Sequence, residues 1–426
     1  MKRFLIIIVL GLSCATGFAQ SEEKGLTWED VEPWNVVDPE PVEPDGHNRQ
    51  WYEDQACAWQ KVVMDDPKNE NAWRNLFRAS YFNEAYSWYK DYYAYVLKVS
   101  EPPLAKTPMT NDVLRKMKAA IPDSNAFYLC ACQLWLPEWG EFDTNILIKA
   151  IENAPKDISD QELRTLILRL WKIYPESTYL EDFFRKLYEK GYYSDRIMRY
   201  GWNLIQSMPK DAIYIAGDWY QYEQILLMQY LWNERKDILV ISYGDIFSDE
   251  NYRKDICKRL KLKPFKPQNY KYDTNRFVAS EFIEYLKYRC DRPFYLSMDL
   301  VGTTELNEDS LYNEGLLIKY SEKRYDNVLV ALHNVKEVYD LDYLVQPMFV
   351  FDPYLSSKYA DNNVVYSLWK LTTLFDRHGY KEATKQLLEF LKKTYNQGLG
   401  GNYYSNYYFF HIDNIKRKEK LSEISR

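Results

Sequence analysis

Residues 208–245 (MPKDAIYIAGDWYQYEQILLMQYLWNERKDILVISYGD) constrain the fold of this chain more than any other segment. Two short runs rich in β-branched residues, 212–216 and 238–242, flank residues 219–233, whose apolar spacing is that of an amphipathic helix. The order of strand, helix and strand requires a crossover connection, so the two strands are predicted to be parallel. A third strand is predicted at 293–298 (PFYLSM). These patterns indicate a small α/β unit.

Residues 48–208 are predicted to form an array of paired helices. Apolar residues recur at spacings of three and four from Tyr52 to Val63, and short loops such as IPDS, APKD and YPES separate the later helical blocks. The phrase DPKNENAWRNLFRASY resembles the start of a tetratricopeptide repeat, which implies a turn followed by a helix. The match rests on the turn residues Asp66, Pro67 and Asn69 and on the large residues Trp73 and Leu76, whereas Phe77 stands where the repeat prefers Gly.

The C-terminal part of the chain is predicted to contain a helical hairpin. Apolar residues on its two helices are expected to face each other across a turn at Gly379: Leu368, Leu371 and Phe375 against Ala383, Leu387 and Leu391. A weaker strand is expected at 315–320. The predicted fold class is therefore mainly α, with a tetratricopeptide-like helical array followed by a small parallel α/β unit and a C-terminal helical hairpin.

These patterns divide the chain into parts. The expected parts are a signal peptide (1–19), an acidic, Pro-rich linker or arm (20–47), the helical repeat array (48–208), the α/β unit (209–350), the helical hairpin (351–396) and an aromatic and basic tail (397–426). Pro and repelling charges resist collapse in the second part, and docking of Trp28 and Trp34 on the folded body would make it an arm.

The first residues predict export. Lys2 and Arg3 precede an apolar run that ends in small residues, which is the layout of a secretory signal peptide with cleavage after Ala19. The apolar run is too short for a permanent membrane anchor. An alternative makes Cys14 the lipid-modified cysteine of a lipoprotein. The mature chain is accordingly expected to be periplasmic or envelope-associated, with no membrane span.

Charge and composition exclude several classes of function. The formal net charge is -7, and it becomes about -9 without the two signal-peptide cations, so nucleic-acid binding is not expected. The cysteines are scattered and do not fit a disulfide framework, although a Cys257–Cys290 bridge stays open. Cys130 and Cys132 lie two apart on a predicted helix and are interpreted as buried. Neither the histidines nor the glycines form a metal, triad or phosphate motif, so no cofactor is expected.

A carboxylate follows each of the three predicted strands. Ligands of open parallel sheets bind beyond the carboxyl ends of the strands, so these acids are candidates for a shared site that binds a sugar or a cation. The candidate ligand-binding residues are Asp218, Tyr220, Tyr243, Asp245, Ser297 and Asp299. For Asp218 and Asp245 the favoured interpretation is that they cap the helices that follow them, whereas the role of Asp299 stays open.

Aromatic residues make up 17% of the chain, and two uses are expected for them. Seams between helices account for the tryptophans at helical spacing, which are Trp59, Trp73, Trp171 and Trp202. A second group lacks helical spacing and lies beside a basic segment, so it is a candidate docking surface for a partner, with burial against the hairpin as the alternative. This group is Tyr403, Tyr404, Tyr407, Tyr408, Phe409 and Phe410.

Several short phrases between residues 207 and 395 carry a family resemblance. They are MPKDA at 208–212, Gly217-Asp218, RKDILVI at 235–241, RPFYL at 292–296, EGLL at 314–317 and the closing hairpin. On these phrases the region resembles the soluble C-terminal region of bacterial membrane proteins of the protein O-mannosyltransferase-like type. The resemblance implies a fold. It argues against glycosyl transfer, because such proteins would carry that site in a multi-span membrane region and no such region is predicted in this sequence. Trp219 and Tyr220 also stand where the family tends to have Asn and Asp.

The predicted architecture favours a non-catalytic scaffold of the cell envelope that binds a protein partner on its helical-repeat surface. The alternative is a carbohydrate-binding or carbohydrate-active protein that uses the acids at the strand ends. The expected partner is therefore a protein, or a glycan under the alternative.

Overall fold

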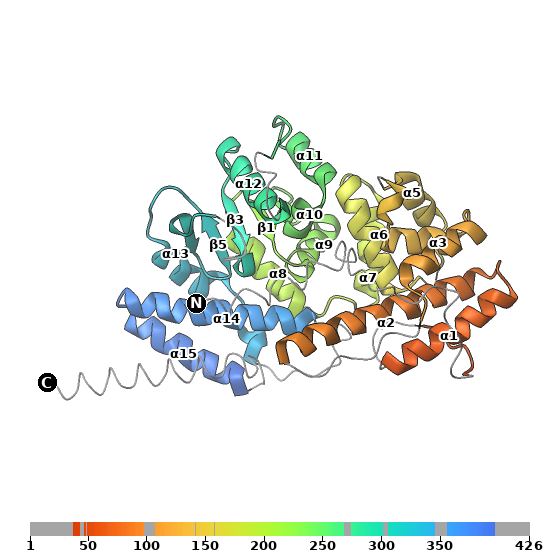
Figure 1. Cartoon of the computed structure of the whole chain (residues 1–426). Helices are drawn as coiled ribbons and strands as arrows, with labels where there is room; N and C mark the ends of the chain where they lie inside the picture. The colour runs from red at the N-terminus through yellow and green to blue at the C-terminus, as the bar shows by residue number, and fades with distance from the viewer. Residues whose placement is uncertain are drawn as a thin grey trace. The chain divides into compact units, whose positions relative to one another are not determined.

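The computed structural model describes residues 37–42, 47, 49–97, 107–140, 142–156, 158–267, 274–300, 306–345 and 356–396. These residues are mainly helical with a small mixed sheet, which confirms the predicted fold class (Figure 1). The described chain divides into two compact units between Phe183 and Phe184; the part before this division is called the helical unit and the part after it the sheet unit. The expected signal peptide with Cys14, the two tryptophans Trp28 and Trp34, and the tail lie outside the described residues.

The helical unit is built from helices that pack on their neighbours in the chain. α1 (Arg49–Asp65) lies against α2 (Glu70–Leu97), α2 against α3 (Thr110–Ala120) and α4 (Asn125–Gln133), and α4 against α5 (Thr144–Glu152) and α6 (Asp160–Ile173). A short 3-10 helix, η3 (Pro137–Trp139), precedes α5, and α7 (Tyr179–Glu189) spans the division between the units. Ser124, Asp143 and Ser159 each accept a backbone N–H in the first turn of α4, α5 and α6, so capping side chains determine where these helices begin.

The turn between α1 and α2 uses the residues that the sequence singles out. Asn69 Oδ1 accepts the backbone N–H of Ala72 (3.0 Å), which caps the start of α2. Trp73 is buried, and its Nε1 donates to the carbonyl of Pro67 (2.9 Å). Phe77 is fully buried as well, so the packing of α2 accommodates a large ring at this position.

The sheet unit contains five strands in the order β2-β1-β3-β5-β4. They are β1 (Ile213–Ala216), β2 (Leu239–Ser242), β3 (Phe294–Ser297), β4 (Leu311–Asn313) and β5 (Leu317–Tyr320). β1 pairs in parallel with β2 and β3, as predicted from the crossover connections. β5 runs antiparallel to β3 and β4 antiparallel to β5, so the complete sheet is mixed. β4 escapes sequence prediction because its 3 residues are too few to show an alternation.

The two faces of the sheet differ in chemistry. One row across β1, β3 and β5 holds Ile213, Phe294 and Tyr320, and the next row holds Tyr214, Tyr295 and Lys319. Successive side chains point to opposite faces, so one face is largely apolar and the other carries tyrosines. α12 (Thr274–Arg289) lies on the first face, where its Tyr288 hydrogen-bonds Tyr320. α8 (Asp195–Ser207) lies on the second face, where its Tyr200 is near Tyr214.

α8 belongs to the sheet unit, because it packs against α9 (Glu223–Trp232) and α14 (Ser356–Arg377). The helical unit therefore ends within α7, earlier than the array predicted for 48–208. An amphipathic stripe shows which side of a helix is buried but not which element buries it. The remaining elements of this unit are α10 (Tyr243–Ser248), α11 (Glu250–Arg259), α13 (Asn327–His333), α15 (Lys381–Asn396), η4 (Trp219–Gln221), η5 (Met298–Leu300), η6 (Glu308–Ser310), η8 (Asp342–Val345) and the π-helical η7 (Asn334–Val338).

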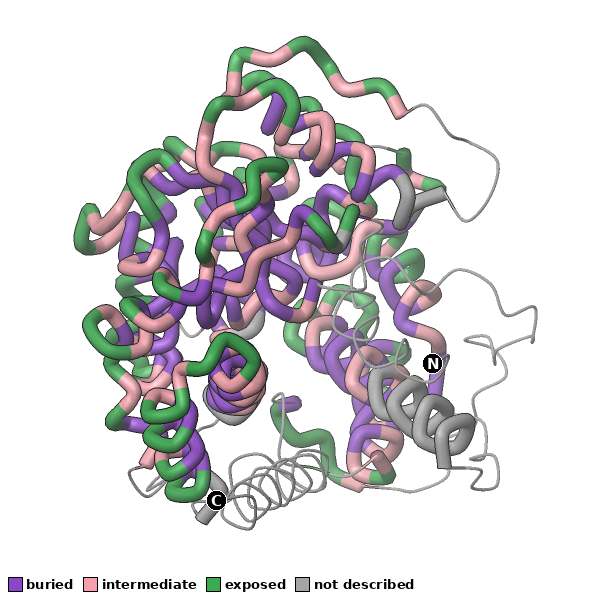
Figure 2. Tube along the Cα trace, turned by 90° about the vertical axis from the view of Figure 1, so that its left-hand side faces the viewer, coloured by how far each residue is buried: buried purple, intermediate pink, exposed green. Residues whose placement is uncertain are grey.

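Burial follows the predicted periodicity in most places, and Figure 2 shows buried residues along the inner sides of the helices. Trp59, Trp73 and Trp171 are buried, whereas Trp202 of α8 is 40% exposed, so the seam interpretation is wrong for Trp202. In the hairpin of α14 and α15, the turn at Gly379 has a φ of 80°, a left-handed conformation that glycine adopts without strain.

Three phrases of the family resemblance meet at the N-terminal ends of the parallel strands. Asp237 accepts the backbone N–H of Asp211 (2.9 Å) and pairs with Arg235 (3.0 Å). Arg292 donates to the carbonyls of Asp211 (2.5 Å) and Asp237 (2.6 Å). The hydrogen bond from Arg235 lowers the pKa of Asp237 to about 2, against a smaller effect of burial. These charged residues therefore fix the loops that enter β1, β2 and β3.

Three further expectations can be compared with the described residues. Within these parts of the chain, no helix combines the length and the apolarity of a membrane span. Cys257 and Cys290 are both free thiols, so the bridge left open above is absent. Cys130 and Cys132 are buried, as predicted, and burial raises the pKa of Cys132 to about 12.

The substitution Gly201→Ala tests the packing of α8. Ala normally stabilises a helix interior by about 1 kcal/mol relative to Gly. Here a Cβ would overlap the Cγ of the fully buried Gln224, and overpacking costs roughly 1–3 kcal/mol. We expect urea denaturation to show a less stable protein, with Gln206→Ala on the same helix as the control. A more stable Gly201→Ala variant would contradict this packing.

Candidate functional site

The candidate functional site lies in the helical unit, where residues 37–42 (VDPEPV) run along α1 and α2. This segment is called the arm. Its prolines alternate with Asp38, Glu40 and Val42, so only these alternate residues offer a backbone N–H in the Pro-containing stretch. Asp38 and Glu40 each precede a proline, which restricts them to extended conformations. The arm thus presents its hydrogen-bonding groups at every second residue.

Two side chains of α1 bind the main chain of the arm. Gln55 Oε1 accepts the N–H of Glu40 (2.7 Å), and Gln55 Nε2 donates to the carbonyl of Asp38 (3.3 Å). Trp59 Nε1 donates to the carbonyl of Glu40 (2.8 Å). Both main-chain groups of Glu40 are therefore satisfied by α1, while the Glu40 residue itself is exposed.

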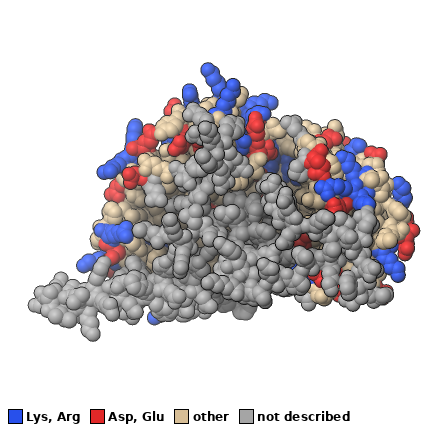
Figure 3. Space-filling view, viewed as in Figure 1, with Lys and Arg blue, Asp and Glu red and all other residues tan. Residues whose placement is uncertain are grey.

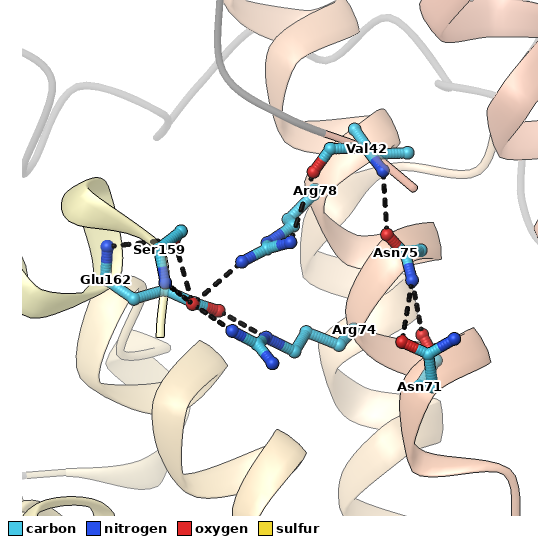
Figure 4. A network of polar contacts seen from close by, with 7 residues as sticks. All are labelled: Val42, Asn71, Arg74, Asn75, Arg78, Ser159 and Glu162. Atoms are coloured by element: carbon cyan, nitrogen blue, oxygen red, sulfur yellow. Dashed lines mark hydrogen bonds and ion pairs between the residues drawn. The ribbon is translucent and has the colours of Figure 1, made fainter. Parts of the chain in front are cut away.

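Two side chains of α2 bind the end of the arm (Figure 4). Asn75 Oδ1 accepts the N–H of Val42 (2.8 Å), and an Nη of Arg78 donates to the Val42 carbonyl (3.1 Å). Asn75 Nδ2 donates to the carbonyl of Asn71 (2.9 Å), which orients the Asn75 amide so that its oxygen faces the arm. Val42 is fully buried. The four side chains Gln55, Trp59, Asn75 and Arg78 are called the arm site.

Glu162, at the start of α6, holds Arg78 in place. Its carboxylate accepts from Arg78 (2.8 Å) and from two nitrogens of Arg74, one of them at 2.7 Å (Figure 4). Glu162 also forms a capping box with Ser159, in which each side chain bonds the backbone N–H of the other. Only 4% of the Glu162 surface is exposed. One buried carboxylate therefore joins the first turn of α6 to the two arginines of α2.

The electrostatics of this cluster favour an ionised Glu162. Burial alone would raise the pKa of Glu162, but the hydrogen bond from Arg74 and the charges of Arg78 and Arg74 outweigh it. The net effect is a pKa below the usual range of a glutamate. Hydrogen bonds in which one group is charged are stronger than neutral ones. The guanidinium that binds the Val42 carbonyl is thus both charge-compensated and fixed in position.

The arm site recognises polypeptide main chain with one aliphatic contact. The arm residues from Asp38 to Pro41 are exposed, so the site does not enclose their side chains. Its donors and acceptors match the N–H and carbonyl groups of alternate residues in an extended segment. Such an arrangement binds and orients a peptide.

Sequence reasoning did not identify the arm site, although a signal for it exists. Gln55 lies four residues before Trp59 on the apolar stripe of α1, where an apolar residue is expected. Asn75 of α2 and Glu162 of α6 are likewise polar residues in buried positions. A polar residue at a core position needs a hydrogen-bond partner, and this requirement is the readable signal. The identity of the partner depends on tertiary structure.

The predicted strand-end site is only partly assembled. Gln221 brings two of its members together: its Oε1 accepts the N–H of Asp218 (3.1 Å), and its Nε2 donates to Asp299 (2.9 Å). Ser297 joins them, because it hydrogen-bonds Asp299 and accepts the N–H of Gly217 (2.8 Å). Burial raises the pKa of Asp299, although hydrogen bonds from Ser297 and Gln221 lower it in part. The hydrogen bonds to the Asp299 carboxylate thus come from two other residues of the chain, Gln221 and Ser297.

The capping interpretation holds for Asp218 and is wrong for Asp245. Asp218 accepts the N–H of Trp219 (2.7 Å) at the start of η4. Asp245 lies inside the first turn of α10, whose N-cap is Ser242. The sequence predicts a loop at this point, but the helix already begins at Tyr243. Burial, and to a smaller extent the nearby charge of Asp245, raise the pKa of Tyr252 in α11.

The two tyrosines of the strand-end set are held by other parts of the sheet unit. Tyr220 accepts a hydrogen bond from Asn363 of α14 (2.8 Å), and its hydroxyl lies near the charge of Asp299. Tyr243 is buried beside Phe247, with ring centroids 6.4 Å apart. A ligand role for the six residues stays a prediction, and the aromatic candidates at 403–410 lie outside the described residues.

Comparisons with known proteins identify no family for this chain. No family model matches the chain, and no curated protein and no solved structure matched it either. The resemblance between residues 207–395 and the mannosyltransferase-like proteins therefore stays a prediction. Among the residues that the structure describes, no group of three or more His, Cys, Asp or Glu side chains is placed to hold a metal ion.

The substitution Glu162→Gln tests the role of the buried carboxylate. It leaves Arg74 and Arg78 without their counter-charge in a site where Glu162 is 4% exposed, and breaking a buried pair costs about 3–5 kcal/mol. The control is Glu138→Gln, which removes an exposed partner of Arg115 and costs at most about 1 kcal/mol. Urea denaturation followed by circular dichroism measures both changes. Equal effects of the two substitutions would contradict the role assigned to Glu162.

Proposed function

We propose that the protein is a non-catalytic scaffold of the cell envelope that binds an extended segment of a protein partner at the arm site. One observation carries the proposal: residues 38–42 of the chain lie on α1 and α2, held through their main chain by four side chains. A surface that binds one extended segment in this way offers the same donors and acceptors to another.

The form of the contact supports a scaffold. Main-chain hydrogen bonds supply affinity without depending on the bound side chains, while the buried position of Val42 determines how the segment is aligned. Glu162 holds Arg78 through a bond that does not involve the arm, and such preorganisation lowers the entropy that binding must overcome. The envelope location rests on the signal-like sequence at 1–19.

The surface charge gives no support to a charged polymer as the partner. On the face drawn in Figure 3, acidic and basic side chains of the described residues are interspersed. The net charge of -7 also disfavours nucleic acid. Both observations favour recognition by hydrogen bonds and packing, which is the chemistry of the arm site.

Crosslinking from envelope extracts tests this function in the full-length chain. Val42→Asp places a carboxylate in a fully buried position and so releases the arm, leaving the arm site available. We expect this variant to capture a protein partner, and we expect Asn75→Ala, added to it, to reduce the capture by about tenfold because one well-placed hydrogen bond is lost.

The matched control is Glu40→Gln, which changes an exposed side chain of the same arm and is expected to capture no more than the wild type. Capture that does not depend on Asn75, or the absence of any crosslinked partner with Val42→Asp, would contradict the proposed function.

A further inference from the structure

We infer that the arm is the chain's own ligand for the arm site and that it closes this site to partner segments of the same chemistry. The ligand class is an extended, proline-spaced segment with a β-branched aliphatic residue at its last contact. This inference rests on the proposed function and adds to it the kind of segment that binds and the way in which binding is regulated.

The hydrogen-bonding pattern defines the ligand class. The N–H groups that the site accepts belong to Glu40 and Val42, and prolines occupy the positions before each of them. A proline has no N–H to leave unsatisfied, so it suits the positions that the site does not bind. A segment that alternates proline with other residues therefore satisfies every contact and is already extended before it binds.

The side chains narrow the ligand class further. Val42 is fully buried, so a residue of similar shape and volume is required at the last contact. Asp38 and Glu40 are exposed, so the acidity of the arm is not part of the recognition. A neutral proline-spaced segment should bind as well as the acidic one.

The strength of the contact suits an occupant that exchanges. The arm gains a few main-chain hydrogen bonds and one buried valine, and the entropy lost on ordering six residues offsets most of these gains. The chain is tied down again at His47, whose ring stacks on Trp51 of α1 with centroids 3.7 Å apart. Only the residues 43–46 separate the two contacts in the sequence.

This short tether gives the arm an advantage over a free peptide. A short connection creates an effective concentration of the order of 1 mM, so a peptide that binds the open site with a Kd of about 0.1 mM would bind the arm-occupied site about tenfold more weakly. Closure by the arm is therefore strong enough to measure and weak enough for a tighter partner segment to displace.

Fluorescence anisotropy with a labelled peptide tests the inference on the full-length chain. The probe is a fluorescein-labelled hexapeptide amide with the sequence of residues 37–42. We expect it to bind the Val42→Asp chain about tenfold or more tightly than the wild type. Val42→Ala, which removes only methyl groups, should give the same direction with a smaller change. The Glu40→Gln chain should match the wild type, and Asn75→Ala added to Val42→Asp should weaken binding about tenfold.

The peptide also has its own controls. A peptide with Glu40→Gln should bind like the original, and one with Val42→Asp should not bind. Equal binding to the wild type and to the released variants would overturn closure by the arm. A lack of saturable binding to released variants that keep the wild-type circular dichroism would overturn the ligand class. Crosslinking that still depended on Asn75 would then leave the proposed function standing.

Discussion

The buried carboxylate of Glu162 is the group on which the arrangement of the helical unit depends. It closes the capping box of α6, forms ion pairs with both Arg74 and Arg78 of α2, and through Arg78 supports the carbonyl of Val42. Each of these contacts is local, but together they connect α6, α2 and the arm through one charge. Because a buried charge without its partner is strongly unfavourable, these elements are coupled in energy as well as in space.

The sheet unit uses the same device at other places. Arg196 of α8 pairs with the fully buried Asp361 of α14 (2.6 Å), and Arg235, Asp237 and Arg292 fix the loops that enter the parallel strands. In both units an arginine bonds a carboxylate and also donates to backbone carbonyls. Arginine suits this role because its planar group carries several donors and stays charged. Charged residues thus connect elements that apolar packing alone would leave free to shift.

How much of this could be predicted from the sequence depends on the range of the interaction. Most of the helices, the three parallel strands and the turn at Asn69 follow from local periodicity and capping, and they are present as predicted. The assignment of α8 to the sheet unit, the antiparallel β4 and β5, and the exposure of Trp202 depend on which surfaces meet, and periodicity does not contain that information.

The candidate site shows the same division. The strand-end acids were visible as a pattern, yet Asp218 caps η4 and Asp299 bonds Gln221, whose role no pattern marks. The arm site was visible only as polar residues on apolar stripes. Its meaning comes from the contact between residues 38–42 and two helices further along the chain, which is a tertiary fact.

Amide hydrogen exchange at Glu40 and Val42 tests the central claim most directly. The account predicts that both amides exchange more slowly than those of an unstructured peptide, because Gln55 and Asn75 accept their protons. It also predicts that Asn75→Ala abolishes the protection of Val42. Exchange of both amides at the rate of an unstructured peptide in the wild type, or protection of Val42 that survives Asn75→Ala, would contradict it.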